Sequence, residues 1–282
     1  MLRPDVLLEV LLASTLVGAQ ALVLNHLGIP FASITLFAGL GGYLVAAGSL
    51  GGAAPAVVLV AVALAFVLFY GLRRSLPDDR YLLLSLAALQ VARAIAGGAK
   101  SWGGQLGTGV TWKGLPTYDA GFFLPVALAA FAGVLVLLRL LERSQLGLAV
   151  ELARLSRGDE RPRALVPVDG LSLLLLGLAA AIAGLVGMTG GLYAGRVSPD
   201  AFGLNLAIST LVATLVAGRR AWTVGIVSLA FFAFPHLFSS LLGYQVEAMG
   251  HLREILWSAA VLFWGPRLMA VGSRFRLHEG AR

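Results

Sequence analysis

The sequence predicts an all-α, polytopic transmembrane helical bundle, and three observations lead to this fold class. Hydrophobic residues make up 59% of the 282 residues and charged residues only 12%, whereas an average soluble domain carries about 25% charged residues. Several apolar runs reach the roughly 20 residues that a helix needs to cross a hydrocarbon core. These runs are continuous and lack the period-two alternation of a transmembrane β-barrel, the other architecture that satisfies its backbone in lipid.

Nine apolar runs follow one another along the chain, so we expect about eight to ten membrane segments in a single transmembrane domain, residues 1–282. The runs cover residues 6–24, 31–48, 55–72, 81–97, 122–141, 171–193, 203–218, 222–242 and 255–271. Acidic residues at the start of the first run, Asp5 and Glu9, favour a retained helix over a cleaved signal peptide. The second run is rich in glycine and follows Pro30, which leaves a spanning and a re-entrant segment as alternatives.

The basic residues indicate which loops face the cytoplasm. The net charge is +7, and 15 of the 21 lysines and arginines lie in four patches, at 73–80, 139–163, 219–220 and 267–282. Cytoplasmic loops carry such an excess, and alternation of the remaining loops then places 98–121, 194–202, 243–254 and the N-terminus outside. Because the charge follows membrane topology, we expect contact with membrane lipid and no nucleic-acid partner.

The long polar connector at about 142–170 contains a predicted surface helix. Within 146–157, three leucines share one side of the helix and three charged residues another; these are Leu148, Leu152 and Leu155, and Glu151, Arg154 and Arg157. One interpretation is a helix resting on anionic headgroups. The other is a helix that docks into a soluble partner.

Small residues recur every fourth position in the run 171–193, at Ala183, Gly187 and Gly191. Such spacing lets two helix backbones approach closely in lipid. Packing within the chain is the simpler interpretation, and a contact across a dimer is the alternative.

A few polar residues interrupt the apolar runs. Arg93 lies beside Gln90 in the fourth run, and Asn205 and Ser209 lie in the seventh. A buried charge is costly in a membrane, so Arg93 should face protein or water and have a partner. Hydroxyl groups in such helices commonly bond to backbone; the alternative is a polar translocation path, for which we select Tyr43, Gln90, Arg93, Asn205 and Ser209.

Signals of catalysis are absent from the sequence. There is no cysteine, and the four histidines lack the spacing of metal ligands. The segment Gly97–Ser101 resembles the end of a phosphate-binding loop, but Ala99 stands where that motif needs glycine. We therefore expect no catalytic residue, metal or cofactor, and no enzymatic activity in this chain.

Six segments, read in order, carry a resemblance to a known family. They are Phe37–Tyr43, Tyr81–Ile95, Thr108–Pro116, Arg143–Gly147, Ala183–Tyr193 and Val197–Phe202. Over about residues 20–225 the chain resembles the larger permease subunit of the ABC importers for branched-chain amino acids and for urea or amides. It departs from the family pattern at Gln90, at Val110 and in the turn Ala217–Ala221.

The resemblance implies a permease of the cell (inner) membrane with partner chains. These would be a second permease subunit, in a hetero- or homodimer, two cytoplasmic ATPase subunits and an external substrate-binding protein. Residues 146–157 would then couple the permease to the ATPases. The implied substrate is a branched-chain or similar small amino acid, with urea or a short amide as one alternative and a secondary transporter unrelated to ABC systems as another.

Overall fold

The computed structural model describes residues 3–29, 31, 34–48, 50–67, 78–99, 104–110, 116–149 and 168–242, with four further positions between 252 and 259. The chain divides into two compact units, Met1–Phe232 and Ala233–Arg282. All of the contacts considered below lie within the first unit.

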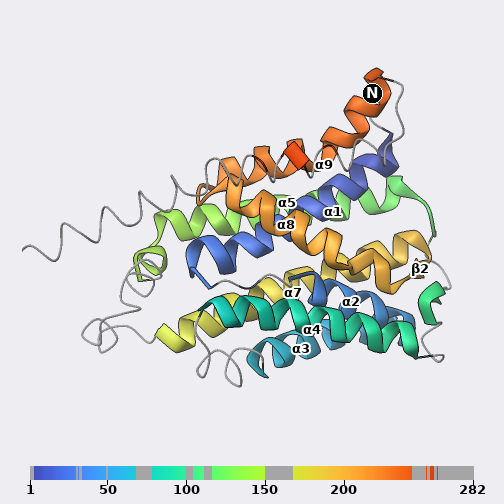
Figure 1. The fold of residues 1–282 in the computed structure, drawn as a ribbon, viewed down its shortest axis with the longest axis horizontal. Helices are drawn as coiled ribbons and strands as arrows, with labels where there is room; N and C mark the ends of the chain where they lie inside the picture. Colours follow the sequence, from blue (N-terminus) through green and yellow to red (C-terminus); the bar gives the residue numbers. More distant parts are fainter. Residues whose placement is uncertain are drawn as a thin grey trace, which may run out of the picture. The chain divides into compact units, whose positions relative to one another are not determined.

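Most of the described residues lie in helices (Figure 1). In chain order they are α1 (Pro4–Ala21), continued by the π-helix η1 (Leu22–His26), α2 (Ile34–Ala47), α3 (Leu50–Val67), α4 (Asp78–Gly98), α5 (Ala120–Arg143), α7 (Val168–Ala194), α8 (Leu204–Ala217) and α9 (Ala221–Leu242). Six segments are long and apolar enough to cross a membrane, and the helices Ile34–Ala47 and Pro55–Ala65 are shorter apolar ones. The prediction of an all-α polytopic bundle is confirmed. The last predicted run, 255–271, lies almost entirely outside the described residues.

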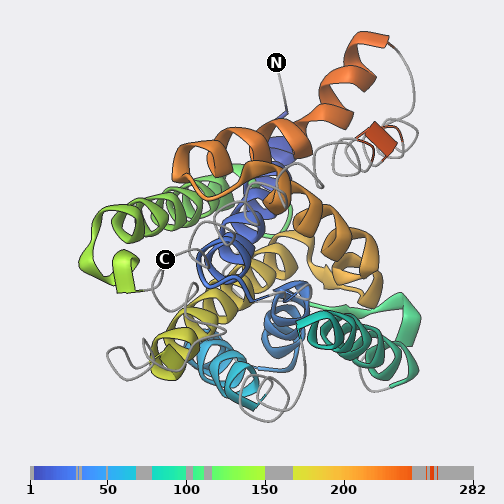
Figure 2. The ribbon, with the colours of Figure 1, turned by 60° about the vertical axis from the view of Figure 1, so that its left-hand side comes forward.

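Two helices form the core of the first unit. In its most apolar window α1 with η1 is 78% buried and α7 is 61% buried, against 22% for α4. Figure 2 shows α1 in blue at the centre, with α5 in green, α7 in yellow and α8 in orange around it, and α1 contacts all three. The N-terminal run is therefore an integral part of the bundle.

The helix α2 is shorter than a full span and packs within the protein along one side. Its 14 residues cover about 21 Å at 1.5 Å per residue, less than the ~30 Å hydrocarbon core. Its main partner is α7, and a Cβ added to Gly41 would overlap the Gly184 carbonyl. Contact with α7 therefore covers one side of this short helix with protein.

The small residues of α7 face α2 within the same chain. A Cβ added to Gly187 would overlap the Ala38 carbonyl, and one added to Gly191 would approach Val197. Ala183 is fully buried. The backbones of α2 and α7 therefore approach closely at Gly187, and all three small residues are buried within the chain.

Contacts between loops define the two ends of the bundle. The strands β1 (Thr108–Gly109) and β2 (Arg196–Val197) pair antiparallel, which places the residues that follow α4 and those that follow α7 at one end. At the other end the Glu142 carboxylate accepts a hydrogen bond from the Ala221 amide. Because arginines gather at the second end, we name it the cytoplasmic end and the first the outer end; these contacts agree with the alternation that the basic residues predict.

Candidate functional site

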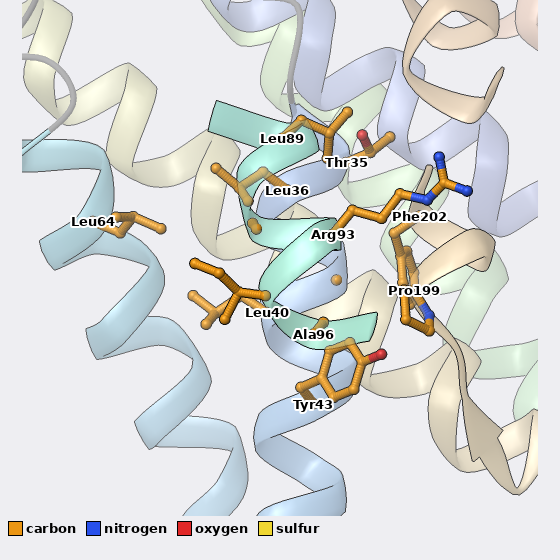
Figure 3. Close-up of a pocket in the computed structure, with 13 residues that line it drawn as sticks. Thr35, Leu36, Leu40, Tyr43, Leu64, Leu89, Arg93, Ala96, Pro199 and Phe202 are labelled. Atoms are coloured by element: carbon orange, nitrogen blue, oxygen red, sulfur yellow. The ribbon is translucent and has the colours of Figure 1, made fainter. Parts of the chain in front are cut away.

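A mainly apolar cavity of about 250 Å³ lies between α2, α3, α4 and the residues that follow β2. Figure 3 shows leucines of α2, α3 and α4 around it, with Phe202 and Pro199 on one side. The polar side chains that reach it are Thr35, Tyr43 and Arg93. The Thr35 hydroxyl is buried and has no hydrogen-bond partner. The cavity is thus mainly apolar, with a few polar side chains in its wall.

A second, more polar cavity of about 430 Å³ adjoins the first. Gln90, Gln105 and Asp200 line it, and Arg93 and Pro199 line both cavities. Arg93 therefore stands at the boundary between an apolar and a polar compartment near the outer end of α4.

Asp200 is the ion-pair partner of Arg93. The Arg93 Nε donates to Asp200 Oδ1 at 3.0 Å, and the Nη2 donates to the same oxygen. Asp200 lies on η7, the short 3-10 helix Pro199–Phe202. The two side chains are 42% and 68% exposed, and an exposed pair contributes only about 0–1 kcal/mol. The pair joins α4 to η7, and breaking it costs little free energy.

The local sequence holds η7 against this cavity. The strand β2 ends at Val197 and pairs with β1, and Pro199 takes the first helical position of η7, where its fixed φ is favourable. On α2, Gly39 and Gly42 allow the Phe202 side chain to come close, since added Cβ atoms would lie 3.4 Å from its Cβ and 3.3 Å from its ring, respectively. The glycine-rich segment of α2 thus has a packing role at the site.

The structure brings together only some of the residues selected for a path. Tyr43 and Arg93 line the apolar cavity, and Gln90 lines the polar one. Asn205, exposed on α8, and Ser209, buried on α8, line neither cavity. Arg93 was expected to have a partner, and the structure shows that this partner is Asp200. The sequence alone did not single out Asp200. Its position directly after Val197–Pro199, in a short outer loop, could have indicated it.

Other hydroxyls of α8 bond to backbone carbonyls. The Thr210 Oγ1 donates to the Ala207 carbonyl at 2.9 Å, and the Thr214 Oγ1 donates to the Thr210 carbonyl at 2.7 Å. These bonds occupy the hydroxyls within their own helix, as the simpler interpretation of this pattern expects.

The start of the predicted coupling helix is visible at the cytoplasmic end. Ser144 ends α5 in an extended conformation, and its Oγ accepts a hydrogen bond from the Gly147 amide at 3.2 Å. A Cβ on Gly147 would overlap the Leu141 carbonyl, so the turn requires glycine. Residues 145–149 are helical, and Leu148 is 64% exposed. The other selected residues, Glu151, Leu152, Arg154, Leu155 and Arg157, lie outside the described residues.

Comparison with known proteins identifies the family. The family model for the permease component of branched-chain amino acid transport systems matches residues 9–263. No curated protein and no solved structure matches the chain. With six helices among its described residues that are long and apolar enough to cross a membrane, the chain is a multi-pass protein of the cell membrane, and it belongs to the family of permease components of branched-chain amino acid transport systems.

Proposed function

We propose that the chain is the membrane-spanning subunit of an ABC importer that moves branched-chain or similar small amino acids inward. Family membership supports the permease role. The energy would come from two cytoplasmic ATPase subunits, and the substrate from an external binding protein. A second permease subunit would complete the membrane part.

The choice of substrate rests on one observation: an apolar cavity has two opposite charges at its rim. The cavity is lined mainly by leucine and other apolar side chains, and burying an aliphatic side chain there is favourable by about 1.5–3 kcal/mol. Arg93 and Asp200 at the rim carry the charges that match a carboxylate and an ammonium group. Leucine has an aliphatic side chain, a carboxylate and an ammonium group, whereas urea has none of these. The lining of the cavity therefore supports the amino acid as substrate.

In this proposal Tyr43, Gln90 and Arg93 line the path. A substrate arriving from the outer end would meet the polar cavity first and the apolar one next, with Arg93 common to both. The carboxylate of the substrate could replace Asp200 on the Arg93 guanidinium. This exchange costs little free energy because the exposed ion pair is weak.

Copurification and uptake test this function together. The tagged chain, expressed in its native host, should retain an ATPase subunit through purification. Uptake of labelled leucine should fall in a strain lacking the chain and return on complementation, with urea uptake unchanged. A chain that never retains an ATPase contradicts the importer; restored urea uptake without leucine uptake contradicts the substrate.

A further inference from the structure

The turn between α8 and α9 has its helix ends capped by residues from other helices. The helix α8 ends at Ala217, and Gly218 follows with a left-handed φ of 69°. The helix α9 begins at Ala221, directly after the exposed Arg219 and Arg220. Arginine is not an N-cap residue, so the first amide groups of α9 need acceptors from elsewhere.

Asn25 caps the end of α8. Its Nδ2 donates to the Thr214 carbonyl at 3.0 Å and also to the Gly218 carbonyl. Asn25 lies in the π-helix that extends α1, and it is buried. This side chain fixes the last turn of α8 to the central helix of the bundle.

Glu142 caps the start of α9. One carboxylate oxygen accepts the hydrogen bond of the Ala221 amide, and the other accepts one from Arg139 Nη1 at 2.7 Å. The Glu142 side chain is only 16% exposed. A carboxylate is well placed at a helix N-terminus, where the helix dipole is positive, so this bond ties α5 to the first turn of α9.

Glu142 also stands at the start of the cytoplasmic segment. Two residues later Ser144 ends α5, and the Ser144–Gly147 hydrogen bond with the close approach of Gly147 to Leu141 makes a tight turn. Residues 145–149 are therefore joined to Glu142 by a short stretch of chain that contacts the last turn of α5.

We propose that Glu142 is a positioning residue for transport, which passes movement of the cytoplasmic segment to the α8–α9 turn and so, through Asn25, to α1. This inference rests on the proposed function, in which the ATPases move that segment. The link that we test is the hydrogen bond that the Ala221 amide donates to the Glu142 carboxylate, and it can be removed from either side.

The experiment measures leucine transported per ATP hydrolysed by the purified complex in vesicles. Glu142→Ala removes the acceptor. Ala221→Pro removes the donor at the first helical position, where proline is favoured, and leaves the Glu142–Arg139 pair in place. Each variant should lower the ratio about tenfold, the change that about 1.4 kcal/mol produces. The double variant should be no worse than either single one, because both changes cut the same bond.

Two further variants separate positioning from general damage. Glu142→Gln keeps an oxygen acceptor and should retain most of the ratio. Thr223→Val removes the 2.7 Å bond from Thr223 Oγ1 to the Arg220 carbonyl in the same turn, without touching the link, and should leave the ratio unchanged. An unchanged ratio in Ala221→Pro, or losses that multiply in the double variant, would overturn the inference even if Glu142→Ala fails to fold. If the unmodified chain retains no ATPase, the proposed function fails and this inference falls with it.

Discussion

At the scale of single residues, two glycines of similar sequence context have opposite structural roles. A Cβ on Gly187 of α7 would overlap the Ala38 carbonyl, whereas nothing lies within 4 Å of the position that a Cβ on Gly133 of α5 would take. The four-residue spacing predicted that Gly187 lies at a close helix contact, but it did not identify α2 as the neighbour. That depends on which helices become adjacent, which no local pattern encodes.

The two glycines give a matched prediction. Gly187→Ala should destabilise the protein by about 1–3 kcal/mol, since the backbone of α2 must shift to admit a methyl group. Gly133→Ala should be neutral or stabilise it by about 0.5–1 kcal/mol, because alanine is the better helix former. Thermal unfolding in detergent measures both variants. A midpoint for Gly187→Ala equal to that of Gly133→Ala would contradict the close contact.

At the scale of elements, the pair Arg93–Asp200 joins α4 to η7 across 107 positions of sequence. The cost of an unpaired charge at membrane depth predicts that Arg93 has a partner, but sequence alone could not select Asp200, because the partner depends on how η7 is held by β2. The same limit applies to Asn205 and Ser209, which line neither of the two cavities.

Replacement of Arg93 tests the substrate path. Arg93→Gln should lower leucine uptake at low substrate concentration about tenfold or more, since a hydrogen bond to a charged group is worth about 1.5–3 kcal/mol. Arg80→Gln is the control, because Arg80 is an exposed arginine of the same helix at its cytoplasmic end and lines neither cavity. Equal uptake by the two variants would remove Arg93 from the path.

Replacing its leucines tests whether the helix predicted over 146–157 docks into the ATPase. Leu152→Ser with Leu155→Ser should abolish retention of the ATPase or its stimulation by substrate, because each leucine buried in a partner groove contributes about 1.5–3 kcal/mol. Arg154→Gln with Arg157→Gln should have a smaller effect, since exposed ion pairs contribute about 0–1 kcal/mol. Copurification and ATP hydrolysis measure both pairs. The reverse order of effects would indicate a helix that rests on lipid headgroups.

At the scale of the whole molecule, the apolar runs of the sequence predicted eight of the described helices. This was possible because a membrane-spanning helix can be recognised from a local window of about 20 residues. The central position of α1 was not predictable in this way. It is less apolar than α5, yet 78% of its most apolar window is buried against 28% for α5. Burial in a membrane bundle depends on neighbouring helices, since lipid and protein interior are equally apolar to a leucine.

The alternation of helices predicts on which side of the membrane each exposed position lies. The chain has no cysteine, so single cysteines can be labelled without background. Pro4 and Tyr118 are exposed at the outer end and Gln145 is exposed at the cytoplasmic end, and replacing any of them by cysteine leaves the basic residues that set orientation unchanged. In spheroplasts a membrane-impermeant maleimide should label Pro4→Cys and Tyr118→Cys at once, and Gln145→Cys only after permeabilisation. Labelling of Pro4→Cys only after permeabilisation, together with immediate labelling of Tyr118→Cys, would place the two ends of α1 the other way round and contradict the contact of Asn25 with the cytoplasmic end of α8.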